Sequence, residues 1–351
     1  MKVIEATGSA YEIGLAHGRE GREQVIRSIE TYRNMFMTYA NLSWEEAKLR
    51  SIYYVEPIKA FDSDLMEELQ GVADGAGVSL EDILALNARS EVIMMSGSVV
   101  MSDGCTSLAV LPEASADGRT WLAQNWDWKG TQLEAVLVLK IKQVNKPEVT
   151  MVTEGGIIGK IGFNSAGIGV CLNALGTIGN PQGLPLHIIL RGILNSSKLS
   201  DALQRINCMQ NACAANYLIA SACGEAMDVE KAPTDFDVLY PQDGIIVHTN
   251  HFVSAKIKVE DLSRLLVPDT FLRYGRADKL IRCKHGSITP DYIKEIFSDH
   301  ADYPDSICRH KDPLDPINMQ MCTVFSVIMN LTDRKMQLVI GNPCSGEFEY
   351  I

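Results

Sequence analysis

The sequence predicts an α+β fold in which layered sheets are covered by helices. Three observations support this prediction. The first third of the chain has apolar residues at helical spacing, and the middle consists of short apolar or alternating runs between turn residues. Further helical segments accompany those runs toward the C-terminus. Helices on both sides of a strand-rich middle are typical of layered sheets that are covered by helices.

The predicted helices fall into two groups. Before Cys105, apolar residues recur at helical spacing in the segments 12–36, 63–77 and 79–93. The last segment begins with Ser79, three residues ahead of Asp82, an arrangement that caps helices. After Cys105, the same spacing predicts helices in the segments 186–197, 200–210 and 268–283.

The predicted strands all follow Cys105. Short runs between turn residues predict strands in the segments 120–128, 134–142, 148–154, 158–175, 216–222, 244–252 and 323–331. Polar residues 332–335 and the apolar segment 336–341 then predict a hairpin. The predicted secondary structure therefore changes at Cys105, from helices before it to mainly strands after it.

The acidic composition excludes several classes of partner. The net charge is −12, whereas nucleic acids and anionic membranes are bound by basic patches. The sequence has no run of about 18 apolar residues that would predict a membrane span. Glu5 lies where a signal peptide would need an apolar core, and the last three residues do not resemble a peroxisomal address. We therefore expect a cytoplasmic protein with neither nucleic acid nor membrane as partner.

Cysteine usage indicates a reducing compartment. The nine cysteines are residues 105, 171, 208, 213, 223, 283, 308, 322 and 344. None forms a C-x-x-C pair, and their spacing predicts no metal site. Most lie in apolar stretches, where a cysteine behaves as a small hydrophobic residue, so we expect reduced core thiols. Cys105 is the exception, because its neighbours are polar residues and a glycine.

The stretch "MSDGCTSLAV", residues 101–110, admits two interpretations. It is either a turn followed by a buried thiol, or a site at which the chain cuts itself between Gly104 and Cys105. A thiol nucleophile needs a base. None of the seven histidines has a peptidase-like surrounding, and His187 has the pattern of a core residue. Cleavage would supply the base, because a free α-amine has a pKa of about 7.7–8.

Four further residues have the chemistry that such a site needs. Asp127 in "QNWDW" could orient the α-amine, and Arg309 in "SICRH" is a permanent cation. Asn173 in "GVCLNAL" and Asn250 in "HTNHF" could donate hydrogen bonds to an oxyanion. Spacing alone leaves open whether these residues converge.

Several segments resemble the isopenicillin N acyltransferase family of N-terminal nucleophile hydrolases. The matching segments, in order, are "YEIGLAHG", "DGCTS", "QNWDW", "TEGGIIGKIGFNSAGIGV", "LNAL", "HTNHF" and "YPDSICR". Together they span most of the chain. The resemblance implies a four-layer αββα sandwich and self-cleavage between Gly104 and Cys105. It also implies a helical segment 1–104 and a catalytic segment 105–351, which form one globular unit and, after cleavage, a heterodimer of the two fragments.

The resemblance also assigns roles to individual residues. Cys105 is the nucleophile, Asp127 orients its α-amine, Asn173 and Asn250 line the oxyanion hole, and Arg309 is the basic residue near the nucleophile. The list of expected pocket residues is Thr106, Ser107, Trp126 and Trp128.

The implied activity is acyl transfer through an acyl-Cys105 thioester. The acyl group passes from a small-molecule donor to a small amine, or from an amide to water. No cofactor or metal is expected, and acyl-coenzyme A would serve as an acyl-donor substrate. Gln320 lies where the family pattern has an arginine, which weakens the expectation of coenzyme A phosphates or aminopenicillanic acid as ligands.

Three alternatives remain at this point. The protein could hydrolyse N-acyl amides, or it could be a non-catalytic scaffold that keeps the fold. It could also be a cysteine peptidase that uses His248 or His251, although Asn250 lies between them in a recognisable oxyanion motif.

Overall fold

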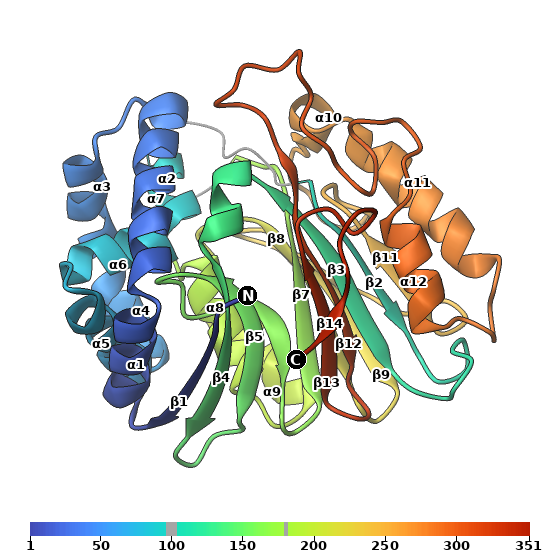
Figure 1. Ribbon diagram of the computed structural model, residues 1–351, viewed down its shortest axis with the longest axis horizontal. Helices are drawn as coiled ribbons and strands as arrows, with labels where there is room; N and C mark the ends of the chain where they lie inside the picture. The colour runs from blue at the N-terminus through green and yellow to red at the C-terminus, as the bar shows by residue number, and fades with distance from the viewer. Residues whose placement is uncertain (96–103, 179–181) are drawn as a thin grey trace.

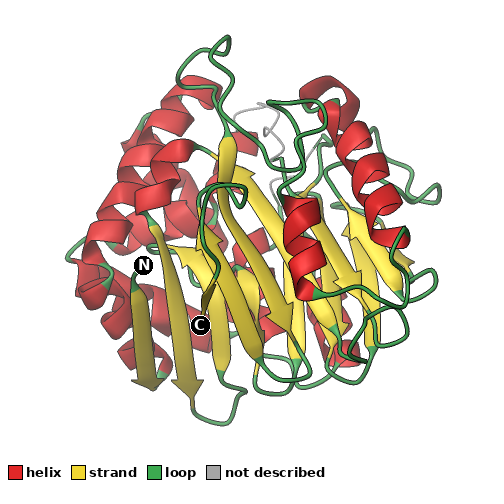
Figure 2. Ribbon diagram, turned by 45° about the vertical axis from the view of Figure 1, so that its right-hand side comes forward, coloured by secondary structure: helices red, strands yellow, loops and turns green. Residues whose placement is uncertain are grey.

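The computed structural model describes residues 1–95, 104–178 and 182–351. Two β-sheets are stacked face to face, and helices cover the outer face of each sheet (Figures 1 and 2). Strands β2 and β3 of one sheet lie against β7 of the other. This is the four-layer αββα sandwich that the sequence resemblance implied.

The larger sheet has eight strands among the described residues, in the order β1-β4-β5-β6-β7-β8-β9-β10. Their bounds are β1 (Val3–Gly8), β4 (Val136–Gln143), β5 (Val149–Glu154), β6 (Ile161–Asn164), β7 (Ile168–Ala174), β8 (Ala215–Ser221), β9 (Glu225–Lys231) and β10 (Phe236–Leu239). The pair β1–β4 is parallel, and every other pair of neighbours is antiparallel.

The smaller sheet has six described strands, all paired antiparallel in the order β11-β2-β3-β12-β13-β14. Their bounds are β2 (Thr106–Val110), β3 (Trp121–Trp128), β11 (Ile245–His248), β12 (Cys322–Asn330), β13 (Lys335–Ile340) and β14 (Glu349–Tyr350). Strand β2 begins directly after Cys105, so the expected nucleophile lies at the start of a central strand.

Helices from the first third of the chain and two later helices belong to the layer beside the larger sheet (Figure 1). These are α1 (Ala10–Glu20), α2 (Arg22–Ala40), α3 (Trp44–Ser51), α4 (Val55–Phe61), α5 (Ser63–Ala76), α6 (Leu80–Asn87), α7 (Arg89–Met94), α8 (Leu186–Leu194) and α9 (Leu199–Asn207). The layer beside the smaller sheet contains α11 (Asp269–Arg282) and α12 (Pro290–Phe297), with α10 (Ser263–Leu266) nearby. Two short 3-10 helices are η1 (Ile52–Tyr54) and η2 (Gly130–Glu134).

Central strands of both sheets are buried over their whole length. Every residue of β3, β8 and β12 is buried, because one face of each strand meets the other sheet and the opposite face meets helices. On β3, Trp126 packs in the core that fills the space between the sheets, whereas Trp121 belongs to a second core under α11 and α12. Successive side chains of β3 therefore serve two different layers.

Several helices and strands of the structure were not predicted from the sequence. The elements that were not predicted are strands β1, β2, β9, β10 and β14 and helices α3, α4, α10 and α12. β1 and β10 are edge strands of their sheet with exposed residues, so they carry little apolar signal. The predicted helix 12–36 is two helices separated at Gly21. The capping box from Ser79 to Asp82 is confirmed.

The segment that precedes Cys105 is joined to the rest of the protein by backbone and side chains. Strand β1 pairs with β4, with Val3 opposite Val138. His17 of the "YEIGLAHG" motif is buried and accepts a hydrogen bond from the backbone N–H of Gly156, at 3.1 Å. Burial lowers the pKa of His17 to about 3, so its ring is neutral and serves packing. The division of the chain at residues 104 and 105 stays a prediction.

Among the described residues, no helix is both long enough and apolar enough to cross a membrane.

Candidate active site

The junction between Gly104 and Cys105 lies inside the protein. Cys105 has no exposed surface, and its carbonyl oxygen accepts a hydrogen bond from Nη1 of Arg273 at 2.7 Å. The same Nη1 also donates to the hydroxyl of Thr106, at 3.2 Å. The backbone at the start of β2 is therefore held by a buried cation.

Gly104 packs against two of the predicted site residues. A Cβ atom added to Gly104 would lie 3.1 Å from Oδ2 of Asp127 and 2.6 Å from Nε of Arg309. Both distances are shorter than ordinary contacts of a Cβ atom, so a larger residue would displace an ionic group. The glycine before Cys105 thus brings the backbone close to a carboxylate and a guanidinium.

Asp127 is held rigidly by the six-stranded sheet. It lies on β3 opposite Thr323 of β12, and the Thr323 hydroxyl donates to Oδ1 at 2.7 Å. Oδ2 lies 3.6 Å from Nε of Arg309. Both ionic groups are buried, so their attraction is screened less than it would be at the surface.

Asn173 reaches the site from the opposite sheet. It lies on β7, and its Oδ1 accepts hydrogen bonds from the Ser107 hydroxyl at 2.7 Å and from Nδ2 of Asn216 at 3.4 Å. These two bonds orient the amide. Among the described residues, its buried Nδ2 has no hydrogen-bond partner. An oriented donor without a partner is what an oxyanion site needs.

Asn250 is fixed at three points. Its backbone N–H donates to the Thr270 hydroxyl at 2.7 Å, and its Nδ2 donates to the carbonyl of Ala174 at 3.1 Å. Its Oδ1 accepts from Nη2 of Arg273 at 3.1 Å. The two asparagines therefore adjoin the same end of β7, because Ala174 follows Asn173.

Arg273 is a site residue that sequence reasoning missed. It lies on α11, is almost fully buried, and contacts Cys105, Thr106 and Asn250 as described above. Its Nε donates to Asp269 at 2.7 Å. The only sequence signal is the i,i+4 spacing of Asp269 and Arg273, which is common on solvated helix faces and points to no function.

Arg309 is held by carboxylates on three sides. Besides Asp127, it pairs with Asp269 and with Asp305. Burial opposes the charge of Asp269, but Arg273 and Arg309 hold the pKa of this carboxyl below its usual value. Asp269 therefore links the two arginines into one network beside Cys105.

The two tryptophans of "QNWDW" pack between the sheets near other buried polar groups. Trp128 donates from Nε1 to the hydroxyl of Tyr32 at 3.0 Å, and Nζ of Lys160 lies 3.3 Å from the ring centroid of Trp126. Glu154 forms short hydrogen bonds with both Tyr32 and Lys160. The assignment of Thr106, Ser107, Trp126 and Trp128 to a substrate pocket stays a prediction, since all four are buried.

The histidines near the site are engaged by other groups. His248 contacts Glu230 through Nε2 at 2.8 Å and the carbonyl of Thr249 through Nδ1 at 2.8 Å. Burial opposes protonation, but Asp228 and Glu230 raise the pKa of His248 to about 9. His187 is buried in α8 and contacts Arg89, as expected for a core residue. A cation paired with Glu230 is poorly suited to serve as the base of a peptidase.

A pocket of about 560 Å³ lies just beyond the C-terminal end of β3. Lys129, Lys311 and Gln320 are among its polar lining residues. Its other lining residues are Thr31, Asn34, Met35, Met37, Thr38, Gly130, Thr131, Ile317 and Asn318. Burial lowers the pKa of Lys129 to about 8. Gln320 has no charge where the family pattern has an arginine, but Lys129 and Lys311 line the same pocket.

All nine cysteines are free, but only some are core thiols. Cys171, Cys213, Cys308 and Cys322 are buried, as expected, and Cys105, the exception in that expectation, is buried as well. The expectation is wrong for the exposed residues Cys208, Cys223, Cys283 and Cys344. All four lie in turns or at the end of a helix, where a neighbouring apolar residue does not imply burial.

Two solved structures resemble the protein weakly. The penicillin V acylase from Agrobacterium tumefaciens is 12% identical, with a TM-score of 0.49 over 70% of this chain and 86% of that chain. A mutant of the conjugated bile acid hydrolase from Clostridium perfringens is 12% identical, with a TM-score of 0.48 over 70% of this chain and 96% of that chain.

Sequence comparisons are more informative. Protein dcd1B of Dictyostelium discoideum is 23% identical over 61% of this chain and 47% of its own. The acyl-coenzyme A:6-aminopenicillanic-acid-acyltransferase 40 kDa form of Emericella nidulans is 31% identical over 98% of this chain and 93% of its own. Residues 114–345 match the profile of the acyl-coenzyme A:6-aminopenicillanic acid acyl-transferase family. The chain therefore belongs to this acyltransferase family.

Proposed function

We propose that this protein is a self-processing acyltransferase whose nucleophile is the N-terminal thiol of Cys105. The observation that carries the proposal is the packing of Gly104 against Asp127 and Arg309. The peptide that would be cut is thereby held beside the carboxylate that would receive the new α-ammonium group. Membership of the acyltransferase family supports the same chemistry.

The proposed cleavage begins with attack of the Cys105 sulfur on the carbonyl carbon of Gly104. The C–N bond breaks, the nitrogen takes a proton, and a thioester joins Gly104 to the sulfur. Water then hydrolyses the thioester. The products are a carboxylate on Gly104 and a free α-amine and thiol on Cys105, held as a heterodimer of 1–104 and 105–351.

In the proposed acyl transfer, the α-amine takes the proton of the thiol, since its ordinary pKa is about 7.7–8. Asp127 accepts a hydrogen bond from the resulting ammonium. The thiolate attacks the carbonyl of the acyl donor, and the oxyanion accepts hydrogen bonds from Nδ2 of Asn173 and from Asn250. The donor's leaving group departs with a proton from the ammonium, which leaves an acyl thioester on Cys105.

The acceptor then attacks the thioester carbon and regenerates the thiol. A small amine gives a new amide, and water gives a free acid, so the same intermediate serves a transferase and a hydrolase. We favour the amine because the relative that matches over nearly the whole chain is named as an acyltransferase. Lys129 and Lys311 would suit an anionic substrate such as acyl-coenzyme A.

Intact mass measurement and N-terminal sequencing of the purified protein test this proposal. We expect two fragments, 1–104 and 105–351, the larger beginning Cys-Thr-Ser. The Cys105→Ala variant should remain whole, whereas Cys283→Ala, which removes an exposed thiol, should be cut as the wild type is. A wild type that stays uncut while it turns over acyl donors would overturn the proposal.

A further inference from the structure

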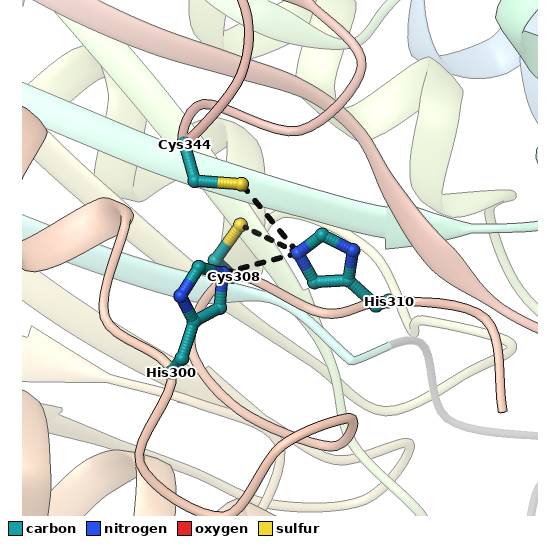
Figure 3. Close-up of side chains that lie close together, drawn as sticks. All are labelled: His300, Cys308, His310 and Cys344. Atoms are coloured by element: carbon teal, nitrogen blue, oxygen red, sulfur yellow. Dashed lines mark hydrogen bonds between the residues drawn. The ribbon is translucent and has the colours of Figure 1, made fainter.

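Two histidines and two cysteines form a compact cluster close to Arg309. They are His300, Cys308, His310 and Cys344, and their ligand atoms all lie within 4.8 Å of one another. Figure 3 shows the four side chains pointing toward a common centre, with the His310 ring facing both sulfurs and the His300 ring. Two neutral imidazoles and two thiolates are the usual donor set of a structural zinc site.

The three contacts of the His310 ring within this cluster fit a tetrahedral metal centre. Nε2 of His310 lies 3.1 Å from Nε2 of His300, 3.6 Å from Sγ of Cys308 and 3.5 Å from Sγ of Cys344. Zinc–nitrogen bonds of about 2.0–2.1 Å and zinc–sulfur bonds of about 2.3 Å imply nitrogen–nitrogen edges near ~3.3 Å and nitrogen–sulfur edges near ~3.6 Å. These three distances therefore agree with the edges of a tetrahedron around a bound zinc ion to within a few tenths of an ångström.

The backbone holds the ligands in place independently of any metal. The N–H of Cys308 donates to the carbonyl of Asp299 at 3.0 Å, and the N–H of His310 donates to the carbonyl of Pro304 at 2.9 Å. Three ligands thus belong to one folded loop after α12. Cys344 comes from the turn after β13, so an ion would join two segments that are distant in sequence.

Arg309 lies between two of the ligands in the chain, and its loop is tied to the same turn. Nδ2 of Asn342 donates to the carbonyl of Arg309 at 2.7 Å, and it approaches Sγ of Cys308 at 3.5 Å. The Arg309 side chain pairs with Asp127 and Asp269 next to Gly104. Whatever fixes Cys308 and His310 consequently fixes the guanidinium beside the candidate nucleophile.

We propose that His300, Cys308, His310 and Cys344 bind a structural zinc ion that positions Arg309 at the active site. Soft thiolates with imidazole in a tetrahedral arrangement select Zn²⁺ over Mg²⁺ or Ca²⁺. All four coordination positions are taken by protein groups, so the ion carries no water for catalysis. The two thiolates balance its charge, and their protons are released when the metal binds.

A disulfide between Cys308 and Cys344 is the main rival, because the two sulfurs are neighbours. It would remove both thiolates and leave the imidazoles as a hydrogen-bonded pair. The rival predicts a mass lower by two hydrogen atoms and no metal, so one preparation tests both.

The full chain is expressed in zinc-supplemented medium, purified without chelator, and dialysed against metal-free buffer that contains a phosphine reductant. Elemental analysis should then find about one zinc per chain. A thiol-modifying mercurial should release that zinc. Cobalt in place of zinc should give the intense visible absorption of a tetrahedral thiolate site. No zinc after reconstitution of the reduced protein with excess zinc, or a Cys308–Cys344 disulfide in the mass spectrum of protein taken before the reductant is added, would overturn the proposal.

Variants locate the ion. Cys344→Ser and His300→Asn should lower zinc affinity by at least about 100-fold, whereas Cys283→Ser and His285→Asn, which alter residues on another turn, should keep a full equivalent. Zinc that survives in Cys344→Ser at wild-type affinity would contradict the site. Removal of zinc from the wild type should lower the thermal midpoint and slow cleavage before Cys105. Unchanged cleavage would refute the positioning role, while zinc content tests the site even if the chain is never cut.

Discussion

The candidate site has two sides that are held in different ways. On one side, Asp127 and Asn173 lie on central strands, where pairing of Asp127 with Thr323 and of Asn173 with Asn216 fixes the backbone. On the other side, Arg273 lies on a helix, and Arg309 lies on a loop, where ion pairs fix the side chains. The strand side is rigid because of the fold. The helix and loop side depends on buried charges and, in our proposal, on a metal ion.

The ion pairs between these side chains explain how their charges can be buried. Asp127, Asp269, Arg273 and Arg309 are all largely buried, and isolated charges in such places are strongly destabilising. Each carboxylate here touches at least one guanidinium, so the network is compensated as a whole. Removing one charged residue should therefore destabilise the protein by more than the loss of its own contacts, because its partners are left without compensation.

The largest effect is expected on the strand side, for Asp127→Asn. The substitution keeps the shape and the acceptor for Thr323 but removes the charge beside Gly104 and Arg309. We expect cleavage and turnover to fall at least about 100-fold. Arg309 keeps Asp269 and Asp305, so the protein should still fold.

Time courses of fragment formation and of acyl transfer measure this effect. Asp117→Asn, which lies before the opposite end of β3 and pairs with Arg119, is the matched control and should behave as the wild type does. A folded Asp127→Asn protein with wild-type rates would show that neither cleavage nor acyl transfer needs the Asp127 carboxylate.

Arg273→Gln tests the helix side. It removes a buried cation that contacts Asp269, Cys105 and Asn250, and we expect the free energy of unfolding to fall by about 3 kcal/mol. On the same helix, Arg276→Gln breaks a partly exposed pair with Asp299 and should cost less than about 1 kcal/mol. Urea denaturation measures both, and equal losses would refute the importance of burial.

His248 gives the site a pH-dependent stability. Asp228 and Glu230 raise its pKa to about 9 against the opposing effect of burial. Because the folded pKa exceeds the unfolded value of about 6.5, its stabilisation is complete below pH ~6.5 and is lost as the pH rises through 9. The loss reaches at most about 1.4 kcal/mol per pH unit.

The measurement is urea denaturation between pH 6.5 and 9.5 for the wild type and His248→Gln. The stability difference between the two proteins should shrink as the pH rises, since titrations common to both proteins cancel. A difference that stays constant across this range would contradict the raised pKa.

Ser107→Ala should have the smallest effect. It removes one hydrogen bond to Oδ1 of Asn173, which is worth about 1 kcal/mol. The amide should then be less well oriented, so kcat should fall several-fold with little change in KM. Ser287→Ala, at an exposed turn, should change neither quantity. A Ser107→Ala enzyme with lower affinity but unchanged kcat would place Ser107 in substrate binding instead.

Sequence reasoning was informative where a polar residue interrupts or ends a buried strand. Asp127 and Asn173 stand out because their neighbours on β3 and β7 are apolar, and the structure brings both close to the start of β2. The layered fold was predictable for the same reason, since continuous apolar runs indicate strands buried on both faces. Edge strands such as β1 and β10 lack this signal.

Groups that come together only through tertiary structure were not predictable. Arg273 looks like an ordinary surface residue until α11 is packed against β2 and β11. The cluster of His300, Cys308, His310 and Cys344 joins two loops separated by more than thirty residues, so no spacing rule identifies it. The prediction of no metal site was based on spacing alone and could not account for such a cluster.

Trapping of the acyl intermediate tests whether the Cys105 sulfur carries the acyl group. The processed protein is mixed with an aryl thioester donor, quenched in acid and weighed intact. We expect fragment 105–351 to gain the mass of one acyl group, peptide mapping to place this group on Cys105, and hydroxylamine to remove it. An acyl group on another residue, or acyl transfer by the Cys105→Ala variant, would show that Cys105 is not the nucleophile.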